Sequence, residues 1–159
     1  MTSVENIKSA DTRANLSDYL RIARLDHITK HVFIIPGIVL ALLLRPAQAE
    51  LGFAPLMLGF LSAVALASAN YVINEWLDRE FDKYHPEKSQ RAAVQKRLSG
   101  TVVYAEYAAL VVAGLGLAWM LNSTFFVIAV LFLISGVTYN VKPLRTKDVV
   151  FGDVLTESI

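Results

Sequence analysis

The chain has 159 residues, of which 55% are hydrophobic and 18% are charged, with a mean hydropathy of +0.47 and a net charge of +1. This small net charge makes no electrostatic case for binding nucleic acid, and the absence of cysteine excludes disulfides and thiolate metal sites. The charges are segregated from long apolar runs, which predicts an all-α, polytopic integral membrane protein and excludes an ordinary soluble domain.

The N-terminal part is polar. Residues 1–16 show no periodicity, and we expect them to form a flexible cytoplasmic N-terminus. Residues 17–30 place apolar side chains on one helical face, which predicts an interfacial helix with Ser17 or Asp18 as its N-cap. A basic flank that only orients the first membrane span fits the same pattern.

Four apolar segments follow, and each predicts a transmembrane helix. A helix over residues 51–73 would be about 35 Å long, which exceeds the roughly 30 Å hydrocarbon core of a bilayer. Small residues such as Gly59, Gly114 and Gly136 favour close helix packing in lipid. The predicted spans, with a cytoplasmic motif loop over 76–100, are residues 31–45, 51–75, 101–121 and 124–140.

Lysine and arginine lie almost entirely on one side of this arrangement. Of the 15 such residues, all except Arg45 fall in the N-terminal segment, in the loop between the second and third spans, or in the C-terminal tail. The positive-inside rule therefore places these three segments in the cytoplasm. We expect a protein of the cytoplasmic (inner) membrane, with its N-terminus and its site on the cytoplasmic side.

A face of amides and carboxylates begins near the end of the second span. Asn70, Asn74, Asp78 and Asp82 recur every four residues, so on a helix each is rotated only about 40° from the last. Glu75 is expected to join this face. Mg²⁺ prefers oxygen ligands and is usually held by one or two carboxylates together with substrate phosphates. The face therefore suits a magnesium diphosphate.

Two interpretations of this helix end are open on spacing alone. In the first, Asp78 and Asp82 are solvated and pair with the neighbouring Arg79 and Lys83. In the second, they form a site with cations that converge on a metal-bound diphosphate. The available cations on the same predicted side are Lys88, Arg91, Lys96, Arg97, Lys142, Arg145 and Lys147.

Three motifs, in order, resemble the UbiA superfamily of intramembrane prenyltransferases. The segment Asn74-Glu75-x-x-Asp78-x-x-x-Asp82 resembles its first aspartate-rich motif. Its downstream loop is resembled by His85-Pro86-x-Lys88-x-x-Arg91 and the following Ser99-Gly100, whereas residues 92–98 between them depart from the family pattern. The segment after its fourth helix is resembled by Tyr139-Asn140-x-Lys142-Pro143-x-Arg145-x-Lys147-Asp148. The family has nine transmembrane helices and a second aspartate-rich motif, so the resemblance implies that residues 17–159 correspond to a partial domain, the N-terminal half of that bundle.

This resemblance implies a role for each matching residue, although Glu75 stands where the family commonly has Asp and Ala92 where it has Pro. Asn74, Asp78 and Asp82 would bind Mg²⁺, and the two aspartates would be the catalytic residues. The substrate phosphates would be bound by Lys30, Lys88, Arg91, Tyr139, Lys142 and Arg145.

Residues 24–33 and 139–143 most resemble the branch of decaprenyl-phosphate phosphoribosyltransferase. That branch implies Mg²⁺-dependent transfer of a phosphoribosyl group from phosphoribosyl diphosphate to a polyprenyl phosphate. Another branch transfers a prenyl group from a polyprenyl diphosphate to an aromatic acceptor. A non-enzymatic alternative is a truncated membrane protein, or a subunit whose bundle is completed by a second chain.

Overall fold

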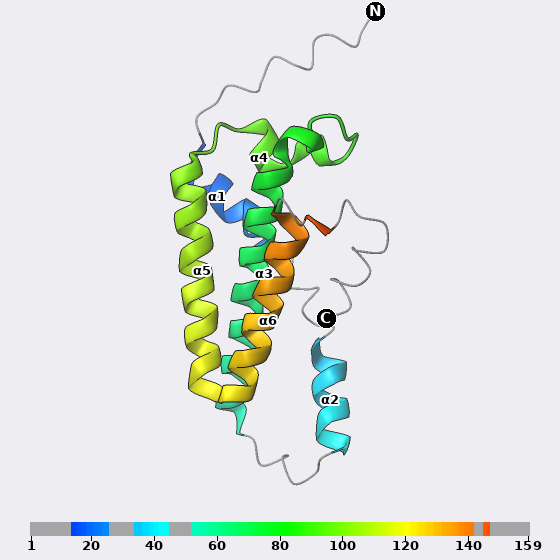
Figure 1. Cartoon of the computed structure of the whole chain (residues 1–159), viewed down its shortest axis with the longest axis vertical. Helices are drawn as coiled ribbons and strands as arrows, with labels where there is room; N and C mark the ends of the chain where they lie inside the picture. Colours follow the sequence, from blue (N-terminus) through cyan, green and yellow to red (C-terminus); the bar gives the residue numbers. More distant parts are fainter. Residues whose placement is uncertain (1–13, 26–33, 45–51, 142–144, 147–159) are drawn as a thin grey trace, which may run out of the picture.

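The structure, a computed structural model, describes residues 14–25, 34–44, 52–141 and 145–146, and every regular element in these ranges is a helix (Figure 1). Three of the helices are long and apolar enough to cross a bilayer. The prediction of an all-α membrane protein is therefore confirmed. The elements are α1 (Leu16–Ile22), α2 (Ile34–Leu44), α3 (Phe53–Asp82), the 3-10 turn η4 (Lys88–Gln90), α4 (Ala92–Gln95), α5 (Gly100–Leu121) and α6 (Ser123–Asn140).

The longest element, α3, organises the others. Its 30 residues make a helix of about 45 Å, along which α5 and α6 pack (Figure 1). The sequence predicted a loop from residue 76, but α3 continues to Asp82 because neither glycine nor proline interrupts residues 60–82. We call residues 74–99, which comprise the last turns of α3 and the segment up to the start of α5, the polar end.

The predicted first span, residues 31–45, falls partly outside the described residues. Its described part is α2, whose 11 residues make a helix of only about 16 Å. In Figure 1, α2 lies apart from the bundle formed by α3, α5 and α6. The total of four spans therefore stays a prediction.

The N-cap of the first helix lies two or three residues before the predicted one. Asn15 is the N-cap of α1, and its backbone N–H donates a hydrogen bond to Oδ2 of Asp18 at 2.9 Å. The prediction of Ser17 or Asp18 was wrong because Asp18 acts from the third helical position, where an acidic side chain can reach back to the cap. Residues 26–30 of the predicted interfacial helix lie outside the described residues.

A small apolar cluster attaches α1 to the polar end. Ile22 and Ala23 are buried against Val72 of α3, Ala93 of α4 and Val103 of α5. Burial of such side chains contributes about 1–3 kcal/mol each. The segment around α1 is thus packed onto α3 and α4, in addition to any contact that it makes with the membrane surface.

Glycines allow the long helices to approach one another closely. A Cβ atom on Gly114 of α5 would lie 2.5 Å from Cδ2 of Leu66, and one on Gly136 of α6 would overlap the side-chain amide of Asn70. The hydroxyl of Ser62 donates a hydrogen bond to the carbonyl oxygen of Gly114 at 2.8 Å. These contacts fix α5 and α6 along α3 and so determine where the segments that follow them reach its polar end.

Candidate functional site

The last turns of α3 carry the predicted metal-binding residues. Asn74, Asp78 and Asp82 are successive positions at intervals of four residues, so they lie along one side of the helix. Asn74 and Asp78 are half-buried, and Asp82 is buried. The helical spacing on which the sequence prediction depended is therefore present.

Asp82 is held by an arginine from the loop that follows α3. Nη1 of Arg91 lies 2.5 Å from Oδ2 of Asp82. The turn η4 reverses the chain after α3, and Arg91 is the N-cap residue of α4, which places its side chain beside the helix end. A charge-assisted pair of this kind is both short and strong.

Asp78 is held by an arginine from much later in the chain. Nη2 of Arg145 lies 3.1 Å from Oδ1 of Asp78, and the guanidinium carbon lies 4.8 Å from the ring centroid of Phe81. Arg145 follows α6, so the packing of α6 against α3 delivers it to the carboxylate. Two basic segments that the sequence only placed on one side thus meet the aspartates directly.

The alternative in which the aspartates pair with their neighbours is wrong. Arg79 and Lys83 instead lie 3.8 and 2.7 Å from the carboxylate of Glu80. The reason is helical geometry, because Lys83 is three residues after Glu80 and shares its face of α3.

Glu75 does not join the aspartate face as predicted. Its Oε2 lies 3.4 Å from Nη2 of Arg24, and its Oε1 accepts a hydrogen bond from the backbone N–H of Ala93 at 3.3 Å. The N–H of Ala93 lies in the first turn of α4 and has no partner within that helix, so it attracts a carboxylate. Glu75 therefore connects α1, α3 and α4. This role depends on the burial of Glu75, which only the structure shows, since a buried carboxylate requires a partner.

Two of the remaining predicted substrate-binding residues, Lys88 and Tyr139, lie within the described ranges. Lys88 is exposed at the start of η4, and its side chain forms no ion pair with the described part of the chain. Tyr139 is half-buried in the last turn of α6. Lys30 and Lys142 lie outside the described residues.

A cavity of about 390 Å³ adjoins the pair formed by Asp78 and Arg145. Leu77 and Phe81 line it from α3, and Asn140 and Arg145 line it from the end of α6 and beyond. Arg79 and Glu80 also line it, so the lining combines apolar side chains with two guanidiniums and one carboxylate. The guanidiniums and the apolar side chains match a phosphate group with an organic substituent.

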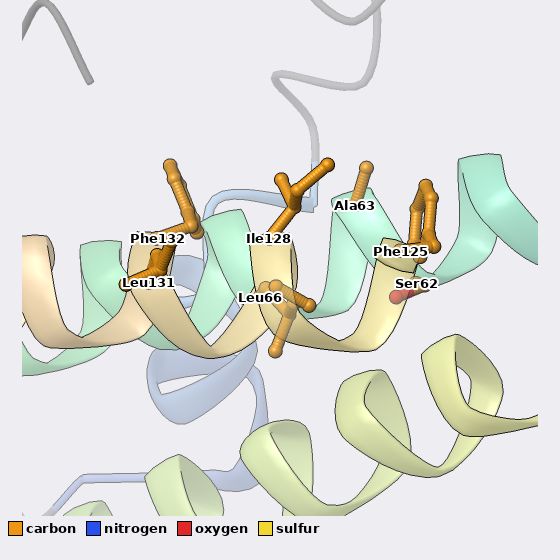
Figure 2. Close-up of a pocket in the computed structure, with 8 residues that line it drawn as sticks. Ser62, Ala63, Leu66, Phe125, Ile128, Leu131 and Phe132 are labelled. Carbon is orange, nitrogen blue, oxygen red and sulfur yellow. The ribbon is translucent and has the colours of Figure 1, made fainter. Parts of the chain in front are cut away.

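A second cavity lies within the apolar body of the bundle and has no charged lining. Its volume is about 320 Å³, and Figure 2 shows Ala63 and Leu66 of α3 together with Phe125 and Ile128 of α6 around it. Ser62, at its edge, precedes Asp78 by 16 residues, or about 24 Å along the helix axis. This cavity therefore takes no part in chemistry at the aspartates.

The donor set at the polar end fits a partly hydrated Mg²⁺ ion. It offers two carboxylates and the amide oxygen of Asn74 on one helix. Mg²⁺ is usually bound through one or two carboxylates, while substrate phosphates and waters complete its coordination shell. No group of three or more histidine, cysteine, aspartate or glutamate side chains gathers anywhere in the described ranges. The described residues therefore suit a metal shared with a substrate better than a closed protein cage.

Residues 33–156 match the model of the UbiA prenyltransferase family. The chain belongs to this family. The match confirms the resemblance that the motifs indicated and extends it over all three long helices. No solved structure matches the chain.

Two curated proteins are similar to parts of this chain. The nodulation protein NoeC of Azorhizobium caulinodans is 43% identical over 47 residues, which cover 30% of this chain and 15% of NoeC. The uncharacterized protein y4nM of Sinorhizobium fredii is 28% identical over 139 residues, which cover 87% of this chain and 26% of y4nM. The chain thus spans about a quarter or less of the length of these relatives.

Proposed function

We propose that the protein is a Mg²⁺-dependent transferase that acts on a polyprenyl substrate and releases diphosphate. The observation that carries this proposal is the double pairing at the polar end, Asp82 with Arg91 and Asp78 with Arg145. Anionic metal ligands and phosphate-binding cations from three separate segments meet there, in a chain of the UbiA prenyltransferase family.

The arginines are suited to exchange one anion for another. A guanidinium binds carboxylate and phosphate with the same planar, two-pronged geometry. When a diphosphate enters, Arg91 and Arg145 would turn from the aspartates to its oxygens, which frees Asp78 and Asp82, together with Asn74, to bind the metal. The ion pairs thus hold each side chain near its working position before substrate arrives.

We further propose that the transferred group is phosphoribosyl. A phosphate oxygen of polyprenyl phosphate would form a bond to C1 of the ribose, and the bond from C1 to diphosphate would break, with the electron pair leaving on diphosphate. Bound Mg²⁺ would stabilise the negative charge of the departing diphosphate as a Lewis acid. Arg91 and Arg145 would supply positive charge at fixed positions, and Lys30 and Lys142 would suit the acceptor phosphate.

The membrane orientation follows the charges. The polar end carries most of the described lysines and arginines, so we propose that it faces the cytoplasm of the inner membrane. The water-soluble donor would enter from that side. The polyprenyl chain of the acceptor would stay within the bilayer beside α3 and α6.

The deciding experiment compares two reactions in membranes that carry the protein. One contains Mg²⁺, polyprenyl phosphate and labelled phosphoribosyl diphosphate, and the other contains Mg²⁺, labelled polyprenyl diphosphate and an aromatic acid. Lipid-linked ribose phosphate is the expected product. A prenylated aromatic acid would assign the protein to the other reaction. If correctly inserted protein forms neither product, the result would favour a non-enzymatic subunit that needs a second chain.

A further inference from the structure

A third cavity lies at the polar end, between the last turns of α3, helix α4 and residues 96–98. Its volume is about 420 Å³. Four cations and one carboxylate line it together with a tryptophan, and these residues are Trp76, Arg79, Glu80, Lys83, Lys96 and Arg97. Arg79 and Glu80 also line the cavity beside Asp78 and Arg145, whereas Trp76, Lys83, Lys96 and Arg97 line only this one among the cavities described above.

This cavity faces away from the aspartates. Trp76 and Glu80 are two residues before and two residues after Asp78, so each is rotated by about 160° from Asp78 around the helix. The side chains of Trp76 and Glu80 therefore leave α3 on the side opposite Asp78, although Arg79 and Glu80 line both this cavity and the one beside Asp78 and Arg145.

The aromatic wall of the cavity is packed in place. A Cβ atom on Gly100 would lie only 3.1 Å from Cζ2 of Trp76, so the start of α5 packs closely against the indole ring. The guanidinium carbon of Arg79 lies 3.8 Å from the centroid of the Trp76 ring, and its Nη1 donates a hydrogen bond to the carbonyl oxygen of Trp76 at 2.6 Å. This stacking holds the guanidinium of Arg79 in a fixed orientation.

The carboxylate of Glu80 holds the cations of α3 together. It lies 2.7 Å from Nζ of Lys83 and 3.8 Å from Nε of Arg79. Among the described residues, the lining of the cavity contains four cations and one carboxylate. A bound anion would compete with Glu80 for Arg79 and Lys83, whose side chains Glu80 already holds in place.

We propose that this cavity binds the phosphate of an anionic phospholipid headgroup from the surrounding membrane. The cations match a phosphate anion, and Trp76 and Leu98 supply apolar surface toward the lipid. The cavity also lies where α3 passes from its apolar run to its charged end, the depth at which headgroups lie. Basic pockets beside transmembrane helices are suited to anionic headgroups.

The test measures the affinity of the purified protein for phosphatidylglycerol and phosphatidylcholine by native mass spectrometry. We expect preferential binding of phosphatidylglycerol. Arg79→Gln should weaken that binding about fivefold, the effect of one cation near a membrane surface. Arg21→Gln, which removes an exposed cation on α1, is the matched control and should leave it unchanged.

Acidic variants provide a prediction of opposite sign. Glu80→Gln removes the anion that competes for the cations, so it should tighten phosphatidylglycerol binding. Glu87→Gln, in the exposed part of the loop, should have no effect. If Arg79→Gln does not fold, Lys96→Gln removes a lining cation without disturbing the stack on Trp76.

Several outcomes would overturn the proposal. Equal affinity for the two lipids, or an equal loss in Arg79→Gln and Arg21→Gln, would mean that the cavity does not select an anionic headgroup. Displacement of phosphatidylglycerol by inorganic phosphate would identify a soluble phosphate as the occupant. Displacement by an equimolar amount of polyprenyl phosphate would assign the cavity to the substrate lipid.

Discussion

The two faces of the end of α3 carry similar numbers of charges but pair them differently. On one face, Asp78 and Asp82 are paired with arginines that lie 67 and 9 residues later in the sequence. On the other, Arg79 and Lys83 are paired with Glu80, which is their close neighbour on the same helix. The side chain of Asp82 is 6% exposed, whereas that of Glu80 is 62% exposed.

This difference separates charges that depend on the fold from charges that do not. A local pair forms on any helix of this sequence, and in water it contributes little. The pairs of Asp78 and Asp82 instead join α3 to segments outside it, so each requires its partner segment to be folded against α3. The aspartate face is therefore the part of the polar end whose geometry the fold maintains.

The largest effect is expected from Asp82→Asn. The substitution keeps the size of the side chain but removes its charge, so the proposed metal site loses a ligand and Arg91 loses its ion-pair partner. Transfer activity in membranes should fall by about 10²–10³, as when an electrostatic contact to a transition state is removed. Glu87→Gln should retain activity, and a similar loss in both variants would contradict the assignment.

Arg145→Lys should produce a smaller loss, seen mainly in KM for the diphosphate donor. Lysine keeps the charge but lacks the planar guanidinium that binds two phosphate oxygens at once. We expect KM to rise about tenfold, since such a hydrogen bond contributes about 1.5–3 kcal/mol. Arg21→Lys is the control, and a purely kcat effect would argue against a role of Arg145 in donor binding.

Glu75→Gln tests the contact that joins α1 and α4 to α3. The amide can still accept the hydrogen bond from Ala93, but the ion pair with Arg24 is lost. Because Glu75 is almost fully buried while Arg24 is partly exposed, we expect a loss of about 1–3 kcal/mol. Thermal unfolding in detergent measures it, and an unchanged Tm would show that the pair contributes nothing to stability.

Gly136→Ala should destabilise the contact between α6 and α3, because its methyl group would overlap the amide of Asn70. Overpacking of this kind costs about 1–3 kcal/mol. Gly116→Ala is the matched control, since a Cβ atom there meets no other atom within 4 Å. The two variants compared in the same detergent should differ in Tm, and equal values would contradict the close approach.

Lys83→Gln should have the smallest effect on stability. Its only described ion pair is with the exposed carboxylate of Glu80, so Tm should not change measurably. A clear decrease in Tm would mean that the local pairs stabilise the fold as much as the distant ones. The contrast between the two faces of α3 would then be lost.

Much of the fold could be predicted from the sequence because it depends on local patterns. Apolar runs and their lengths identified α3, α5 and α6, and the interval of four residues placed Asn74, Asp78 and Asp82 on one side of a helix. Segregation of charge also placed the loop cations and the tail cations on one side of the membrane. Each of these inferences needs only neighbouring residues.

The pairing at the polar end could not be predicted in this way. The partner of Asp78 depends on how α6 packs against α3, and that packing depends on Gly136 meeting Asn70. Glu75 shared the spacing of the aspartates, but its direction was decided by Arg24, which is 51 residues earlier. Contacts with other segments determine which of several carboxylates at helical spacing belongs to the site.

The sequence separations of the three arginine pairs also order their formation during synthesis. When α3 has been made, Glu75 can already meet Arg24, and Asp82 meets Arg91 as soon as nine more residues have followed. Asp78 can pair with Arg145 only after 67 more residues have been made, when α5 and α6 have entered the membrane. The ion pair between Asp78 and Arg145 is therefore the last of the three to close, and it reports that the helical hairpin of α5 and α6 has inserted and docked on α3.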